Sequence, residues 1–151
     1  MQTGIQKARN ILLADDDHDD RGFFRDAFAA IAGNTNLLMV ENGVELMNVL
    51  QKKTTTEPDL IFLDLNMPRK NGYECLAEIK QQEQLKHLLV VIISTSIQPD
   101  AVNYVYKHGA SLYIVKPNRF EQLKKMIEQV LLLHEKNKLV QTPREKFILE
   151  A

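Results

Sequence analysis

The chain has 151 residues, of which 44% are hydrophobic and 26% are charged, with a formal net charge of -1. These values are typical of one globular domain and exclude a disordered chain, while the near-zero charge provides no basic field for nucleic acid or an anionic membrane. With one cysteine, Cys75, no signal peptide and no apolar run of membrane-spanning length, we expect a cytoplasmic protein without an internal disulfide.

Short apolar runs alternate with segments of helical period along the chain. The runs are continuous rather than alternating, which is typical of parallel strands buried on both faces. The expected strands are Ile11–Ala14, Leu37–Val40, Leu60–Leu63, Leu89–Ile93 and Leu112–Val115. The expected helices contain Phe24 to Ile31, Leu46 to Leu50, Tyr73 to Ile79, Ala101 to Val105 and Phe120 to Leu131. This alternation predicts an α/β fold, a doubly wound five-stranded parallel sheet with helices on both faces.

The chain divides into a polar lead over residues 1–9, one domain over residues 10–135 and a tail over residues 136–151. The boundary at residue 135 is placed where the apolar stripe of the last helix stops. The tail is rich in lysine and arginine and is too short for a second domain. Its end, Phe147-Ile148-Leu149, is interpreted as a frayed terminus, with an interaction surface as the alternative.

Polar side chains stand at the ends of four of the expected strands. Connections between parallel strands are right-handed, so all the carboxyl ends meet at one edge of the sheet, where ligands bind in open α/β folds. The sequence therefore predicts a small polar site at this edge. Its members are Asp15 and Asp16 after the first strand, Asp64 after the third, Ser94 after the fourth and Lys116 after the fifth.

The acidic part of this site predicts a magnesium ion. Three carboxylates at one point repel each other, and a hard divalent cation with oxygen ligands resolves the repulsion. Asp16 and Asp64 are the best direct ligands, and Asp15 would act directly or through water. The backbone carbonyl of Asn66 could supply a further ligand.

The basic and hydroxyl groups indicate phosphoryl chemistry. A carboxylate such as Asp64, held beside Mg²⁺, can attack phosphorus to form an aspartyl phosphate. The phosphoryl group carries charge on several oxygens, of which Lys116 could bind one and Ser94 another. Phosphoryl transfer depends mainly on positioning and electrostatics, which this set of residues supplies.

Four motifs in this order resemble the active set of two-component response-regulator receiver domains. They are Asp15-Asp16, Asp64 in Leu-Asp-Leu-Asn-Met-Pro, Ser94, and Lys116-Pro117. The resemblance spans residues 10 to 134 and implies a flavodoxin-like fold with strand order 2-1-3-4-5. It also implies a phosphorelay protein whose Asp64 receives phosphate from a sensor histidine kinase or a phosphotransfer protein. No DNA-binding segment follows, so the chain is similar to stand-alone receivers, in particular those that serve bacterial phytochromes.

The resemblance implies further roles near the fifth strand. Tyr113 matches an aromatic switch residue that turns inward when phosphate draws Ser94 toward the site. The face formed by the fourth helix, the fifth strand and the fifth helix would then bind a downstream protein target, or a second copy of the chain in a homodimer. The family pattern also places a cis peptide bond between Lys116 and Pro117.

Three alternatives are weighed against a phosphoacceptor with at most slow self-dephosphorylation. A phosphorylation-independent scaffold could keep the same site. A Mg²⁺-dependent phosphatase with Asp64 as nucleophile needs a general acid two residues later, where this chain has Asn66. A flavodoxin-like cofactor binder needs a glycine-rich or hydroxyl-rich phosphate loop after the first strand, where this chain has three aspartates. We therefore expect a signalling switch rather than an enzyme.

Overall fold

The structure is a computed structural model that describes residues 9–31, 35–52, 56–140 and 142–151. Apart from Arg9, the lead expected over residues 1–9 lies outside the described residues. The strands are β1 (Arg9–Ala14), β2 (Thr35–Val40), β3 (Leu60–Leu63), β4 (Val90–Ser94), β5 (Leu112–Val115) and β6 (Ile148–Leu149). The helices are α1 (His18–Ile31), α2 (Gly43–Gln51), α3 (Gly72–Gln81), α4 (Pro99–Lys107) and α5 (Phe120–Glu135), with a 3-10 turn η1 (Arg144–Lys146).

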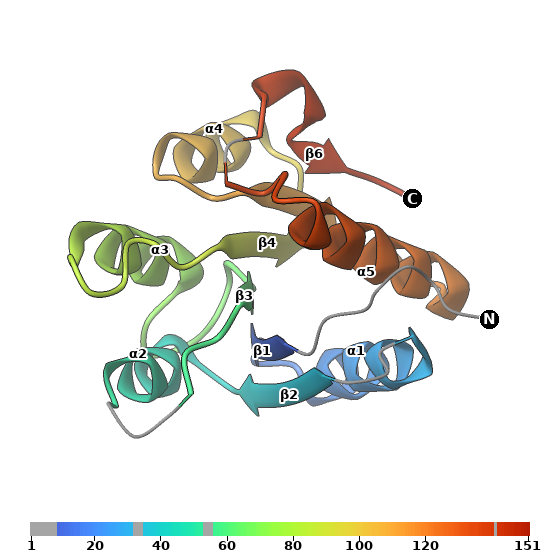
Figure 1. Cartoon of the computed structure of the whole chain (residues 1–151), viewed down its shortest axis with the longest axis horizontal. Coiled ribbons are helices and arrows are strands. Elements are labelled where there is room, and N and C mark those ends of the chain that lie inside the picture. The colour runs from blue at the N-terminus through green and yellow to red at the C-terminus, as the bar shows by residue number, and fades with distance from the viewer. Residues whose placement is uncertain (1–8, 32–34, 53–55, 141) are drawn as a thin grey trace.

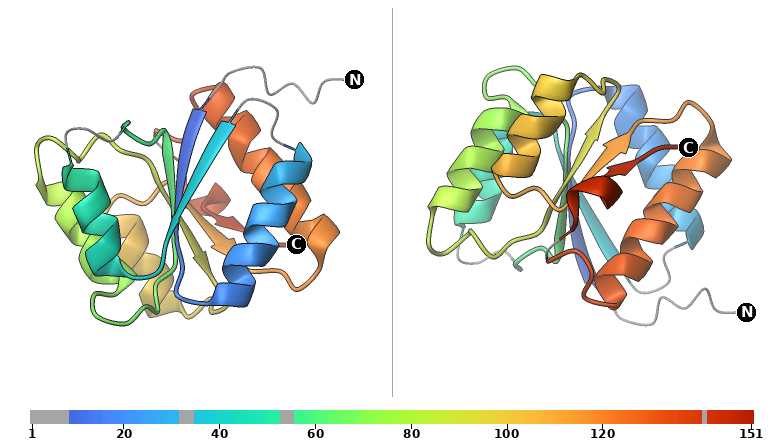
Figure 2. Two further views of the ribbon diagram at one scale, coloured as in Figure 1. Left: turned by 90° about the horizontal axis from the view of Figure 1, so that it is seen from below. Right: turned by 90° about the horizontal axis from the view of Figure 1, so that it is seen from above.

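The strands form one parallel sheet with helices on both faces. Helices α1 and α5 cover one face, and α2, α3 and α4 cover the other (Figure 1, Figure 2). The sheet order is β2-β1-β3-β4-β5-β6, so the expected α/β class and the order of the first five strands are confirmed. The expected number of five strands is wrong, because the tail adds β6 beside β5. None of the described helices is long and apolar enough to cross a membrane.

Two apolar layers, one on each face of the sheet, hold the fold together. Leu12 and Ile61 point toward α2, α3 and α4, whereas Ile11 and Phe62 point toward α1 and α5, as the period of a strand requires. Every residue of β3 is 0% exposed, which explains why the strand has no polar position. The central strands therefore emerge from the core only at their ends, where the polar residues begin.

The loop that follows β3 is held tightly against the start of α3. The Gly72 N–H donates to the Leu65 carbonyl at 2.9 Å. A Cβ atom on Gly72 would lie 2.2 Å from the Asp64 carbonyl oxygen, so this close approach requires glycine. Asn71 closes a capping box with Glu74 at the same helix start. The backbone around Asp64 is thereby fixed by α3 as well as by the sheet.

The end of the tail is folded rather than frayed. The side chain of Phe147 is 0% exposed and packs edge-to-face on Tyr106, with ring centroids 4.9 Å apart. Ile148 and Leu149 pair with β5, which would otherwise be an open edge of the sheet. We call residues 142–149 the tail strap. The expectation of a frayed terminus is wrong because the contacts that hold it are tertiary. Phe147 and the free edge of β5 come together only when the chain is folded.

Candidate functional site

The predicted site residues lie at the carboxyl edge of the sheet because the backbone ladder continues past the strand ends. The Asp64 N–H donates to the Ala14 carbonyl at 2.9 Å, and the Lys116 N–H donates to the Ser94 carbonyl at 2.8 Å. The Asp15 N–H donates to the Val40 carbonyl at 3.1 Å. These bonds fix the backbones of Asp15, Asp64 and Lys116 independently of the contacts that their side chains make.

Three carboxylates meet at this edge. Asp15, Asp16 and Asp64 each offer an oxygen, and these oxygens lie within 4.8 Å of one another. Asp15 and Asp64 are buried, at 2% and 6% exposure, whereas Asp16 faces solvent. The sequence prediction that the three acids come together is therefore confirmed as geometry.

Burial makes the charge on Asp64 costly. Loss of solvent raises the pKa of the Asp64 carboxyl to about 7, against the opposing effect of the Lys116 charge. The charges of Asp15 and Asp16 raise it further, and a backbone hydrogen bond from Asn66 lowers it. The carboxylate is thus poised between its neutral and charged forms near neutral pH, and a nearby cation would favour the charged form.

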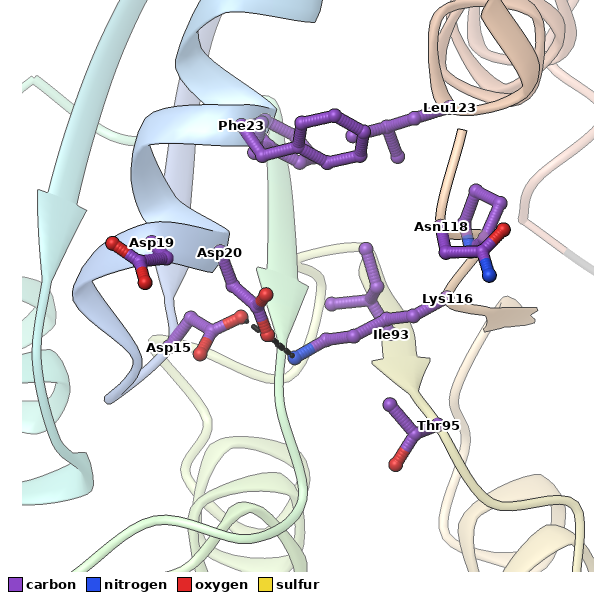
Figure 3. Close-up of a pocket in the computed structure, with 11 residues that line it drawn as sticks. Asp15, Asp19, Asp20, Phe23, Ile93, Thr95, Lys116, Asn118 and Leu123 are labelled. Atoms are coloured by element: carbon purple, nitrogen blue, oxygen red, sulfur yellow. Dashed lines mark hydrogen bonds and ion pairs between the residues drawn. The ribbon is translucent and has the colours of Figure 1, made fainter. Parts of the chain in front are cut away.

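Lys116 is bonded to the acidic cluster from the opposite side. Its ammonium Nζ lies 2.8 Å from Asp15 Oδ2, 2.9 Å from Asp20 Oδ2 and 3.8 Å from Asp64 Oδ2 (Figure 3). Burial acts to lower the pKa of Lys116, but the hydrogen bond with Asp15 and the charges of the acids outweigh it, so the pKa is raised. Lys116 therefore stays protonated, and its positive charge offsets part of the negative charge of the cluster.

The hydroxyl and aromatic members of the predicted site lie on β4 and β5. Ser94 is 1% exposed, and its Oγ accepts a hydrogen bond from the Ser96 N–H at 3.2 Å. Tyr113 is 0% exposed, and its hydroxyl donates to the Ser96 carbonyl. The two residues are therefore connected through the backbone of Ser96.

Two expectations about this region need correction. The Lys116–Pro117 peptide bond is trans, since the described residues contain no cis bond, and the expected cis bond is wrong. The trans form is the more stable isomer of a bond before proline, and from it Lys116 already reaches two carboxylates. Asp20, in the first turn of α1, was not among the expected site residues, but it accepts a hydrogen bond from Lys116. Nothing in the local pattern marks Asp20 as a site residue, because acids are common in the first turn of any helix.

A cavity of ≈ 390 Å³ opens beside Lys116, on the side of α1 and α5. Asp20 and Phe23 of α1 line it, together with Ile93, Lys116 and Leu123 (Figure 3). The two acids that bond Lys116, Asp15 and Asp20, also line this cavity. The lysine thus stands between an open, partly apolar space and the carboxylate cluster.

The donor set fits a hard divalent cation. Hard cations such as Mg²⁺ and Mn²⁺ prefer carboxylate and carbonyl oxygens, and three carboxylate oxygens within 4.8 Å of one another can share one ion. Lys116 contributes one positive charge, which leaves negative charge in the cluster when all three acids are ionised. Burial raises the pKa of Asp64, and the charges of the neighbouring acids raise it further.

The chain is similar to known proteins over most of its length. The family model of the response regulator receiver domain matches residues 11–128. The response regulator Rcp1 of Synechocystis sp. is 34% identical over 124 residues, which are 80% of this chain and 84% of Rcp1. The crystal structure of the Mn²⁺-bound form of Rcp1 is similar with a TM-score of 0.74 at 32% identity, covering 81% of this chain and 91% of that chain. The crystal structure of the phosphorylated cyanobacterial phytochrome response regulator RcpA is similar with a TM-score of 0.79 at 32% identity, covering 87% of this chain and 96% of that chain.

Replacing Asp64 with asparagine tests the electrostatics of the cluster. The pKa of Asp64 is about 7 in the folded chain, above its ordinary value of 3.8, so the folded state retains the proton as pH rises. The contribution of Asp64 to stability is therefore expected to be fully present below pH 4 and to be lost between pH 4 and pH 7. Asp64→Asn removes this loss. In metal-free buffer at pH 8 the variant should be more stable than the wild type by on the order of 2 to 4 kcal/mol, and the difference should vanish near pH 4.

Urea unfolding with a chelator present, repeated from pH 4 to pH 8, measures this difference. Adding Mg²⁺ at pH 8 should stabilise the wild type and narrow the gap, because the cation favours the charged form of Asp64. A gap between the two proteins that does not change with pH would contradict the electrostatic origin.

Proposed function

The chain belongs to the response regulator receiver family of two-component systems, and we propose that Asp64 is its phosphoacceptor. The observation that carries the proposal is the position of Asp64: it ends the central strand β3 beside two acids and one lysine. The phosphoryl donor would be a sensor histidine kinase or a phosphotransfer protein.

Each residue of the site has a part in this transfer. A carboxylate oxygen of Asp64 forms a bond to phosphorus while the bond from phosphorus to the donor breaks, and the donor keeps that electron pair. Lys116, 3.8 Å from the Asp64 carboxylate, donates a hydrogen bond to a phosphoryl oxygen. Ser94, one strand away, donates its hydroxyl hydrogen to another. The proposed mechanism needs no movement of the backbone, because the three strand ends are already adjacent.

A divalent cation completes the proposed site. Asp15, Asp16 and Asp64 would hold it, with the backbone carbonyl of Asn66 as a further ligand. When bound, the ion supplies positive charge that offsets the charge of the phosphoryl oxygens. We propose Mg²⁺, because it accepts one or two carboxylates together with phosphate oxygens.

The similarity to Rcp1 and RcpA supports a more specific role. RcpA is a cyanobacterial phytochrome response regulator, and both relatives match more than four fifths of this chain. We propose that the kinase that serves this chain is a phytochrome-type sensor. The output would be a change on the face of α4, β5 and α5, where Tyr113 lies, that alters the binding of a downstream protein.

Incubation with acetyl phosphate and Mg²⁺ tests the assignment of the phosphoacceptor. The wild type should gain the mass of one phosphoryl group, and Asp64→Asn should gain none, because an amide cannot form an acyl phosphate. Asp19→Asn is the matched control, since the Asp19 side chain is 100% exposed and should leave the gain unchanged. Intact mass spectrometry at several times measures all three proteins. Equal phosphorylation of Asp64→Asn and the wild type would contradict the assignment, and no phosphorylation of either would favour a scaffold.

A further inference from the structure

Asp20 lies in the first turn of α1, but its carboxylate bonds a lysine on a distant part of the chain. Asp17 caps the helix, and its Oδ1 accepts from the Asp20 N–H at 3.0 Å. An acid at the position of Asp20 commonly accepts a hydrogen bond from the backbone of the capping residue. Here the Asp17 N–H instead donates to Asp15 Oδ1 at 3.0 Å. The Asp20 carboxylate bonds Lys116, which belongs to the other end of the chain.

This bond uses one of the few hydrogens that Lys116 can offer. An ammonium group has three N–H donors. Asp15 accepts one at 2.8 Å and Asp20 accepts a second at 2.9 Å, whereas Asp64 lies beyond hydrogen-bond distance at 3.8 Å. The Asp15 side chain is 3% exposed and the Asp20 side chain is 43% exposed. Asp20 is therefore the partner that water can replace most easily.

We propose that Asp20 is a positioning residue that restrains Lys116 on the α1 side of the site, away from Asp64. The inference rests on the proposed role of Asp64 as phosphoacceptor. A phosphoryl group on Asp64 competes with Asp20 for the lysine, so the Asp20 carboxylate weakens the hold of the site on the phosphoryl group. An ordinary surface ion pair, without influence on Lys116, would have no such effect.

Beryllofluoride, a mimic of the bound phosphoryl group, tests this role by calorimetric titration at saturating Mg²⁺. Asp20→Asn should bind beryllofluoride about 3-fold to 10-fold more tightly than Asp19→Asn, because it frees Lys116. Asp19→Asn carries the same change of charge one residue away, and Asp19 is 100% exposed. Asp20→Glu should restore weak binding. Mg²⁺ alone should bind the two asparagine variants equally, which separates the effect on Lys116 from a general change in the field.

The outcomes separate this inference from the function on which it rests. If the wild type binds beryllofluoride and Asp20→Asn binds it no more tightly than Asp19→Asn, the role of Asp20 is overturned and that of Asp64 stands. If the wild type binds no beryllofluoride at saturating Mg²⁺, the proposed function itself is overturned.

An independent set of contacts links the site to the tail strap. The Ser94 Oγ accepts from the Ser96 N–H at 3.2 Å, and the Ser96 carbonyl accepts from the Tyr113 hydroxyl. The Tyr113 N–H donates to the Phe147 carbonyl at 2.9 Å. The rings of Tyr113 and Phe147 also touch, with centroids 6.4 Å apart. A continuous series of contacts thus runs from the end of β4, through β5, to the strap.

The strap holds Tyr113 in its inward position. Tyr113 and Phe147 are both 0% exposed, and protein interiors are closely packed, so Tyr113 can leave its place only if Phe147 moves. The strap itself is attached to α4 by a hydrogen bond from Arg144 to Asn103 at 3.2 Å. These contacts link the position of Tyr113 to the docking of the strap.

We infer that occupation of Asp64 strengthens docking of the tail strap through Ser94, Ser96 and Tyr113, again on the premise that Asp64 is the phosphoacceptor. Coupling between two sites is reciprocal, so a weakened strap must weaken binding at Asp64. Phe147→Leu should lower beryllofluoride affinity about 3-fold or more while keeping the chain folded. Val140→Ala is the matched control, because this apolar side chain is 73% exposed and lies outside the tail strap.

Hydrogen exchange of the Tyr113 amide gives the direct readout of docking. Beryllofluoride with Mg²⁺ should slow this exchange in the wild type, because the amide is bonded to the strap. Equal beryllofluoride affinities in Phe147→Leu and Val140→Ala, or exchange that is unchanged by beryllofluoride bound to the wild type, would overturn the coupling. Absence of beryllofluoride binding to the wild type would instead overturn the proposed function.

Discussion

Negative charge confined at one edge of a buried sheet governs the chemistry of this protein. Asp15 and Asp64 are almost completely removed from solvent, and Asp16 completes a cluster whose oxygens lie within 4.8 Å. Buried carboxylates are unfavourable unless cations compensate them. Lys116 supplies part of the compensation, and a divalent ion fits the remainder. Burial raises the pKa of Asp64, the neighbouring acids raise it further, and a divalent cation beside the carboxylate would favour its charged form.

The fold positions the site residues by fixing their backbones at the ends of the strands. Five apolar strands end where the core ends, and hydrogen bonds beyond the ladder continue the sheet into Asp15, Asp64 and Lys116. The close approach of Gly72 locks the loop after β3 from the other side. On β5, the hydroxyl of Tyr113 donates to the Ser96 carbonyl near the site, and its N–H donates to the Phe147 carbonyl in the tail strap. The ordered strand ends and the docked strap are the two parts that the proposed coupling connects.

The parts of this structure that the sequence predicted are those that local pattern controls. Continuous apolar runs identified five strands, and the polar residues that end them identified the acids and Lys116. Strand β6 was missed because two residues carry no periodicity, and their pairing depends on Phe147 being buried by α4 and β5. The bond between Asp20 and Lys116 was missed because the two residues are 96 positions apart. The isomer of the bond before Pro117 was expected incorrectly from family likeness, since local sequence fixes it only weakly.

A crystal structure of the chain with Mg²⁺ and beryllofluoride tests the central claim most directly. It should show beryllofluoride on the Asp64 carboxylate, the metal on Asp16 and Asp64, and the Lys116 ammonium moved from Asp20 to a fluoride. Beryllofluoride on another carboxylate, or on Asp64 without any contact to Lys116 and the metal, would contradict the view that the cluster and the lysine act as one phosphoryl-binding site.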